Sequence, residues 1–134
     1  MRRIYLDYAS STPVDAAVER AMRPYFSKIF ANAHSAHWPG QQASAAVFAA
    51  RQKIARAIGA ADYRSVIFTG SATEANNLAL RSQAGAGQKI IVSAVEHESV
   101  LETVRDLQKK AAVKVAIIPV NRAGLINLKA LKDA

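Results

Sequence analysis

Small and hydroxyl-bearing residues lie between an apolar run and a stretch of helical periodicity near the middle of the chain. Residues 69–77 read Thr-Gly-Ser-Ala-Thr-Glu-Ala-Asn-Asn, directly after the apolar run at 66–68. A strand that enters a helix through small residues leaves free backbone N–H groups at the positive end of the helix dipole, where phosphate groups bind. The segment alone fits a second interpretation equally well, in which Thr73 is only the N-cap and Glu74 supports the dipole.

A histidine follows the next apolar run. Glu96-His97-Glu98-Ser99 comes directly after the run that ends at Val92-Ser93. This is the carboxyl end of a predicted parallel strand, where α/β proteins place their ligands. A histidine at a helix start can also be a cap or a surface residue, but the position on the ligand edge favours a binding role. We therefore expect His97 on the same edge of the sheet as Thr73.

Two further segments hold polar residues. Asp7 precedes Ala-Ser-Ser-Thr-Pro at 9–13, and Asn32, Ser35 and His37 lie in a polar stretch predicted to be a loop over 32–40. The pattern gives these side chains no packing role. They are therefore candidates for ligand contacts.

The first half of the chain is predicted to be mainly helical. Ile4 to Leu6 forms a short strand, and Asp15 caps a helix that runs to about Phe30 with a kink at Pro24. Apolar residues at helical spacing predict a second helix from Gln41, which ends at a left-handed cap on Gly59.

The second half alternates strands with helices. Continuous apolar runs at 66–68, 90–92 and 113–120 predict three parallel strands buried on both faces. Helices are predicted between them at 73–84 and 98–110, the second with Val100, Val104 and Leu107 facing inward. Asn127 is expected to cap a last helix. This order is typical of an α/β layered sheet with right-handed crossovers.

Composition favours a globular protein with one core. The chain is 51% hydrophobic and 21% charged, and its longest apolar runs are shorter than a membrane span. No signal-type segment opens it, so we expect a cytoplasmic protein without a membrane partner. The sequence contains no cysteine, which excludes disulfides, thiolate metal ligands and a thiol nucleophile within these 134 residues.

The net charge of +8 raises the question of a nucleic-acid partner. Arg105, Lys109 and Lys110 share a predicted helix with acidic residues at spacings that suit ion pairs, and no aromatic residues interleave with them. This distribution favours solvated helix faces over a nucleic-acid patch.

Taken together, the polar segments resemble cysteine desulfurases, pyridoxal-phosphate (PLP) enzymes of the class V aminotransferase family. The resemblance covers the whole chain in order and at the family's spacing. It is carried by Tyr5-Leu6-Asp7-Tyr8 with residues 9–13, the Asn-x-x-Ser-x-His of 32–37, residues 67–69 leading into 72–79, and Glu96-His97 with residues 99–101. Gly70-Ser71 stands where the family usually has Ser-Gly.

The resemblance implies a fold. Residues 1–134 would be one partial domain, the first part of the large domain of a fold type I PLP-dependent transferase, with three α/β/α layers and mostly parallel strands. Residues 1–14 would be an N-terminal small-domain segment, and 15–134 would begin the PLP-binding domain. In that fold the first strand, here 66–69, is separated from the next two by strands from later in the chain.

The resemblance also implies site roles. Ala72 and Thr73 would bind the PLP phosphate, His97 would stack on the pyridine ring and act in catalysis, and we assign Asn32 to substrate binding. The full enzyme would convert L-cysteine to L-alanine and an enzyme-bound persulfide for iron–sulfur cluster or thio-cofactor assembly. Family members are homodimers, and a sulfur-acceptor protein is a possible partner.

Two residues required for that chemistry have no counterpart here. The Schiff-base lysine and the persulfide-carrying cysteine lie further along in the family, and none of the eight lysines of this chain is a persuasive substitute. One hypothesis is the N-terminal part of a desulfurase that needs its C-terminal remainder. The others are a non-catalytic remnant or regulatory module, and part of a selenocysteine lyase or another class V aminotransferase.

Overall fold

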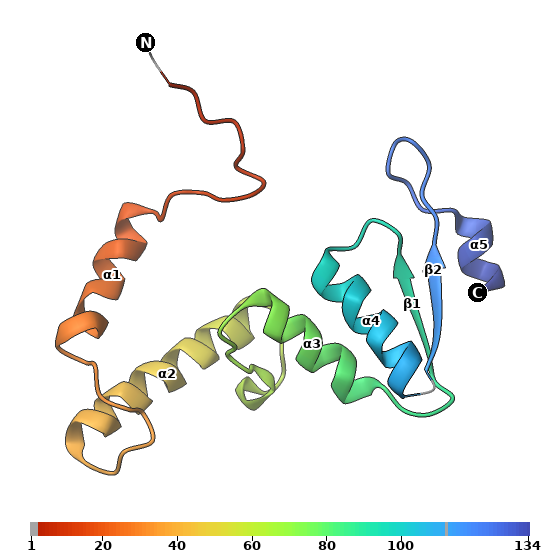
Figure 1. The fold of residues 1–134 in the computed structure, drawn as a ribbon. Helices are drawn as coiled ribbons and strands as arrows, with labels where there is room; N and C mark the ends of the chain where they lie inside the picture. Colours follow the sequence, from red (N-terminus) through yellow and green to blue (C-terminus); the bar gives the residue numbers. More distant parts are fainter. Residues whose placement is uncertain (1–2, 112) are drawn as a thin grey trace. The chain divides into compact units, whose positions relative to one another are not determined.

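The computed structural model describes residues 3–111 and 113–134, which form two compact units on either side of the Val66–Ile67 peptide bond (Figure 1). The first unit holds the helices α1 (Ala16–Ser27) and α2 (Trp38–Ala57) and the short 3₁₀ helix η1 (Tyr63–Ser65). The second holds α3 (Ala72–Gln83), β1 (Lys89–Ser93), α4 (Glu98–Lys110), β2 (Lys114–Ile118) and α5 (Leu128–Asp133).

The N-terminal segment is a turn and not the predicted strand. Residues 4–6 lie in no strand of the described chain. The Tyr5 hydroxyl donates to the carbonyl oxygens of Asp7 and Ser11, at 3.0 and 3.1 Å, and the Tyr5 ring packs edge-on against Tyr8. The short apolar run lacks a neighbouring strand, so local hydrogen bonds determine its backbone instead.

Helix α1 begins as predicted and ends earlier. The Asp15 carboxylate accepts the Ala17 N–H at 2.7 Å, which confirms the N-cap. Pro24 lies inside the helix, and its carbonyl oxygen accepts both the Lys28 and the Ile29 N–H, at 2.8 and 2.9 Å. Sharing one acceptor between two donors breaks the regular i to i+4 pattern, so the helix ends at Ser27 and not near Phe30.

Helix α2 begins at Trp38, inside the predicted loop. Pro39 is tolerated because first-turn N–H groups need no intrahelical acceptor, and the His37 Nδ1 accepts the Gly40 N–H at 3.2 Å. A Cβ at Gly40 would lie 2.3 Å from the Ser35 carbonyl oxygen, so only glycine lets the loop close onto the helix. Ser35 and His37 therefore have structural roles that the sequence pattern did not reveal.

The predicted end of α2 is confirmed. Gly59 has a φ of 70°, and the Ala60 N–H donates to the Ala55 carbonyl oxygen at 2.9 Å. This is the bond that a left-handed C-terminal cap makes. Beyond it, η1 packs against α2 through the rings of Tyr63 and Phe48, whose centroids are 5.0 Å apart.

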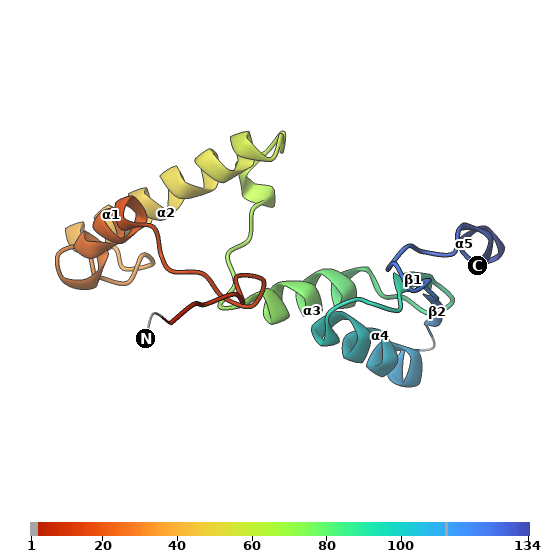
Figure 2. The same ribbon diagram turned by 90° about the horizontal axis from the view of Figure 1, so that it is seen from above.

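The second unit contains a parallel strand pair between helices. β1 and β2 run in register from Lys89 opposite Lys114 to Ser93 opposite Ile118. Both ribbon views show the order α3, α4, strands, α5 (Figures 1 and 2). Val104 of α4 is fully buried, and Leu107 and Ile118 are nearly so. The bounds of α4, two of the three strands and the Asn127 cap of α5 confirm the predicted α/β alternation.

The first of the three predicted strands, at 66–69, is absent from the described chain. Residues 66–69 lie in no strand or bridge, and Ile67 and Phe68 are 64% and 47% exposed. The prediction of at least three buried strands was therefore wrong. An apolar run forms a strand only where a neighbouring strand accepts its hydrogen bonds, and the sheet of the described chain has two strands.

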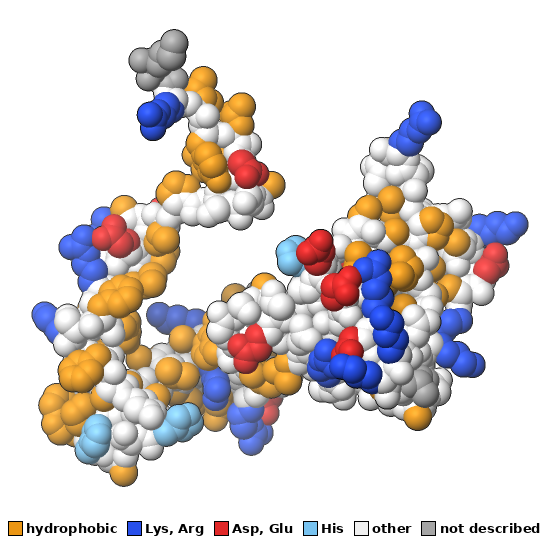
Figure 3. Space-filling model, viewed as in Figure 1, with side chains coloured by type: hydrophobic (Ala, Val, Ile, Leu, Met, Phe, Trp, Pro, Cys, Tyr) orange, Lys and Arg blue, Asp and Glu red, His pale blue; other side chains and the backbone are white. Residues whose placement is uncertain are grey.

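Many large apolar side chains are open to solvent. Figure 3 shows hydrophobic atoms exposed along the N-terminal segment and α1, where Leu6 and Phe26 are each more than 70% exposed. In the strand pair, Ile91 and Ile117 are each 43% exposed. Exposed apolar surface on this scale favours association with another surface.

We predict that the 134-residue chain self-associates when it is pure. Each uncovered large apolar side chain forfeits about 1.5–3 kcal/mol of burial. Because a domain has only about 5–15 kcal/mol of net stability, a few such side chains are decisive. Sedimentation velocity should show oligomers or aggregates, and circular dichroism should show a broad melt. A monomer with a sharp cooperative melt would contradict this prediction.

Candidate functional site

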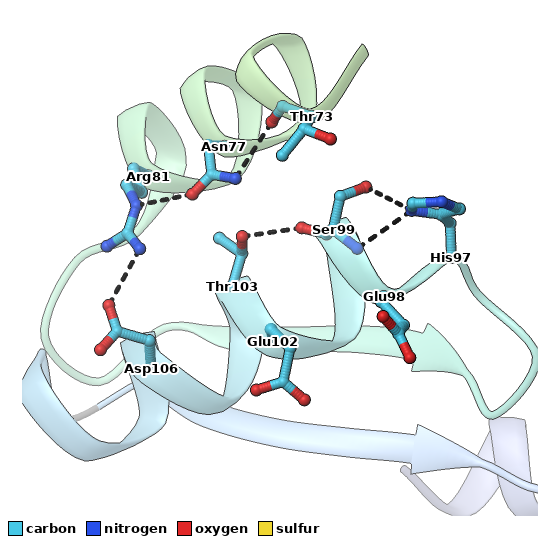
Figure 4. Close-up of a pocket in the computed structure, with 9 residues that line it drawn as sticks. All are labelled: Thr73, Asn77, Arg81, His97, Glu98, Ser99, Glu102, Thr103 and Asp106. Atoms are coloured by element: carbon cyan, nitrogen blue, oxygen red, sulfur yellow. Dashed lines mark hydrogen bonds and ion pairs between the residues drawn. The ribbon is translucent and has the colours of Figure 1, made fainter. Parts of the chain in front are cut away.

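A groove of about 540 Å³ lies between α3 and α4 (Figure 4). Thr73 and His97 both line it, although 24 positions separate them in the sequence. The full lining consists of polar and charged residues: Thr73, Asn77, Arg81, His97, Glu98, Ser99, Glu102, Thr103 and Asp106. The structure thus brings two of the sequence-derived site residues to one surface.

The start of α3 is built by Ser71 and Glu74. The Ser71 Oγ accepts the Glu74 N–H at 3.1 Å, and the Glu74 carboxylate accepts the Gly70 N–H at 2.7 Å. This arrangement is close to a capping box. Ser71, and not Thr73, is therefore the N-cap, which overturns the structural alternative considered for Thr73.

The cap places Ala72 and Thr73 as the first two residues of the helix. Their N–H groups have no acceptor within the helix, and both residues are exposed. Gly70 is not among the glycines with positive φ, and Ser71 is extended, with a φ of −162°. The turn therefore does not need glycine's left-handed freedom, which is why Gly70-Ser71 can stand in place of Ser-Gly.

His97 is the N-cap of α4. Its Nδ1 accepts the Ser99 N–H at 3.1 Å and lies 2.9 Å from the Ser99 Oγ. The same Oγ accepts a hydrogen bond from the Asn76 Nδ2 of α3 at 2.9 Å. The capping role considered from the sequence is thus real, and it leaves the exposed imidazole at the mouth of the groove.

The profile of the class-V aminotransferase family matches residues 4–134. The chain belongs to this family.

The most similar relatives of this class-V aminotransferase chain include cysteine desulfurases. The cysteine desulfurase IscS of Rickettsia felis is 43% identical over 136 residues, which cover 98% of this chain and 33% of the relative. A solved NifS-like protein superposes with a TM-score of 0.86 at 31% identity, covering 98% of this chain and 37% of that chain. The chain thus spans about a third of the length of the relatives that it matches.

A second similar structure holds an amino-acid ligand. The protein SspA in complex with cysteine superposes with a TM-score of 0.82 at 35% identity, covering 97% of this chain and 38% of that chain. The similarity extends over both compact units. The mixed α/β fold of the described chain therefore corresponds to part of the NifS-like fold.

Class-V aminotransferases depend on PLP, and the start of α3 fits its phosphate. Ala72 and Thr73 offer two open N–H groups and one hydroxyl at the positive end of a 12-residue helix. The Gly70 N–H is already bonded to the Glu74 carboxylate, so it would contribute only if that carboxylate moved. Ala72 and Thr73 are thus the residues that would hold the phosphate.

Asn32 belongs to the other compact unit of this class-V aminotransferase chain. Its Oδ1 accepts the His34 N–H at 2.9 Å, and its carbonyl oxygen accepts the Ser35 N–H at 3.0 Å. One side-chain acceptor is therefore used to hold the turn. The substrate-binding role of Asn32 stays a prediction.

A shared carboxylate connects the two helices of the groove. Asp106 of α4 contacts Arg81 of α3 at 2.9 Å and Lys110 of its own helix at 2.7 Å. Hydrogen bonds from Lys110 and Arg81 lower the pKa of Asp106 from its ordinary value of 3.8. Figure 3 shows acidic and basic side chains alternating over α4, in keeping with the ion pairs expected from the sequence.

Sequence reasoning missed the residues that join α3 to α4. Asn76 and Arg81 are polar positions on a predicted helix, and nothing in their spacing indicated partners on α4. Ser99 was noted only as part of the segment around His97. The part of the chain that the structure describes contains no helix with the length and hydropathy of a membrane span, and no group of His, Cys, Asp or Glu side chains there is placed to hold a metal ion.

We predict that Asp106→Asn loosens α3 from α4 in a pH-dependent way. The folded pKa of Asp106 is lowered, so its contribution is present above the ordinary value and is lost as the pH falls through the folded pKa. Hydrogen exchange of α3 should be faster in the variant at pH 7, and the difference should disappear as the pH falls through the folded pKa of Asp106. Glu102→Gln is the matched control, because Glu102 pairs with Arg105 inside α4. Equal exchange in wild type and Asp106→Asn at pH 7 would contradict the prediction.

Proposed function

We propose that this chain supplies the phosphate-binding and ring-stacking part of a PLP-dependent cysteine desulfurase. The reaction converts L-cysteine to L-alanine and an enzyme-bound persulfide, whose sulfur is used in iron–sulfur cluster or thio-cofactor assembly. The observation that carries the proposal is that Thr73 and His97 line one groove, at the N-terminal ends of two neighbouring helices. The similarity to cysteine desulfurases over 98% of the chain supports this choice of reaction class.

The residues of this chain have binding and positioning roles in the proposal. The open N–H groups of Ala72 and Thr73 and the Thr73 hydroxyl bind the phosphate, where the helix dipole favours negative charge. His97 presents its exposed ring to the face of the cofactor. Asn32 contributes to recognition of the substrate. PLP, when bound, supplies the electron sink for the carbanion chemistry.

The proposal requires groups that these residues do not supply. The sequence contains no cysteine, and the groove is lined by no lysine among the described residues. We therefore propose that the nucleophilic cysteine and the Schiff-base lysine come from a C-terminal remainder. This function would also require a second copy of the enzyme, to form a homodimer, and a sulfur-acceptor protein.

We predict that the 134-residue chain alone releases no sulfide from L-cysteine beyond the rate of free PLP. Without a thiol there is no nucleophile to take the substrate sulfur. The test is sulfide release by the pure chain with PLP, compared with PLP alone. Adding the C-terminal remainder should restore activity. If the reconstituted protein is active only with selenocysteine, the selenocysteine lyase alternative replaces this proposal. If it has no activity with either substrate, the non-catalytic module replaces it.

We predict different effects for the two groove residues in the reconstituted enzyme. Thr73→Ala should weaken PLP binding by about 1–3 kcal/mol, the range for losing a hydrogen bond to a charged group. His97→Ala should lower turnover more than it lowers PLP retention, because phosphate contacts hold the cofactor. PLP binding is measured by absorbance titration. Ser82→Ala is the control, because its hydroxyl donates within α3 to the Ala79 carbonyl oxygen. Unchanged PLP affinity in Thr73→Ala would place the phosphate elsewhere.

A further inference from the structure

The imidazole of His97 receives two contacts at one ring nitrogen. The Ser99 N–H donates to Nδ1 at 3.1 Å, and the Ser99 Oγ lies 2.9 Å from the same atom. Figure 4 shows both interactions meeting at this nitrogen, with the other ring nitrogen turned away from Ser99. A backbone N–H can only donate, so Nδ1 must be an acceptor. The proton of the neutral ring therefore lies on Nε2.

The Ser99 hydroxyl is itself oriented by the neighbouring helix. The Asn76 Nδ2 donates to the Ser99 Oγ at 2.9 Å, across 23 positions of sequence. Because Asn76 already supplies the donor to this oxygen, the single hydroxyl proton is free to point at Nδ1. Asn76 and Ser99 are both half-buried, whereas His97 is exposed. The chain of contacts thus runs from a sheltered part of the α3–α4 interface to an exposed ring.

We propose that Ser99 and Asn76 are positioning residues for His97: the Ser99 N–H holds the ring in the Nε2–H tautomer, and the Ser99 hydroxyl, oriented by Asn76, fixes the ring so that Nε2 faces a bound ligand. This inference rests on the proposed function. In that function, His97 meets the cofactor and substrate as a hydrogen-bond donor at Nε2. Any proton that His97 delivers also leaves from Nε2. These groups act together. The Asn76 amide donates to the Ser99 Oγ, which leaves the hydroxyl proton for Nδ1, and the Ser99 N–H requires Nδ1 to be an acceptor.

The chain offers substitutions that separate these contributions. Ser99→Ala removes the hydroxyl, and Asn76→Ala removes the amide that orients it, whereas both variants keep the backbone donor. Ser99→Pro also removes the N–H. Residue 99 is the second residue of α4, and Pro39 occupies the same position in α2, so the helix can begin with proline there. Asn77→Ala is the matched control, because its Nδ2 donates to the Thr73 carbonyl oxygen within α3.

The test is magic-angle-spinning NMR of the full chain labelled with ¹⁵N-histidine, at a pH where imidazole is neutral. This method tolerates self-association, and His97→Gln identifies the His97 signals among the three histidines. Wild type and Asn77→Ala should show His97 in the Nε2–H form alone. Ser99→Ala and Asn76→Ala should keep this form but show a second orientation of the ring. The ratio of the wild-type orientation to the second orientation should fall about three- to tenfold. Ser99→Pro should show both tautomers.

Two results would overturn the inference. One is a wild-type His97 that shows the Nδ1–H form or a mixture. The other is that Ser99→Ala and Asn76→Ala give spectra identical to wild type, which would mean that the hydroxyl and the amide do not position the ring. Neither readout involves PLP or turnover. Failure of the desulfurase proposal, seen as absent PLP binding in the reconstituted enzyme, is therefore distinguishable from failure of this inference.

Discussion

The packing of α4 against both β2 and α3 is the constraint on which the groove depends. Val104 anchors α4 in the core of the second unit, while Ser99 and Asp106 on the same helix bond to α3. One helix thus carries the apolar contacts that position it and the polar contacts that position its neighbour. Because Thr73 is on α3 and His97 caps α4, their separation follows from this single interface. Weakening the interface would alter the site without touching either residue.

Local polar chemistry determines where the helices of this chain begin. Asp15, His37, Ser71, His97 and Asn127 each accept a backbone N–H from the first turn of the helix that they precede. At two of these starts the cap is a histidine, a less common choice than a hydroxyl or a carboxamide. A histidine that caps through Nδ1 keeps its other nitrogen for a second partner. The structural and the functional interpretations of His97 are therefore compatible.

Much of the second unit was predictable, because its signals are local. Continuous apolar runs and helical spacing identified α4, β1 and β2, and Asn127 was recognised by its capping chemistry. Residues 66–69 show the limit, since an apolar run specifies a strand only when a partner strand lies beside it. Pairing between helices was also beyond the sequence, because Asn76 and Ser99 become neighbours only after α3 and α4 pack. Ser71 was missed as a cap because Thr73, two positions later, has the same chemistry.

The close contact at Gly40 has a consequence for how the chain folds during synthesis. The groups that a Cβ would meet there, on Ser35 and Asn32, lie only a few positions earlier in the sequence. Closing so short a loop costs little chain entropy, and the His37 cap and the Asn32 turn satisfy their backbone groups without help from distant segments. We therefore expect this corner to form as soon as it leaves the ribosome. It would then give α2 a fixed starting point before any strand of the second unit has been made.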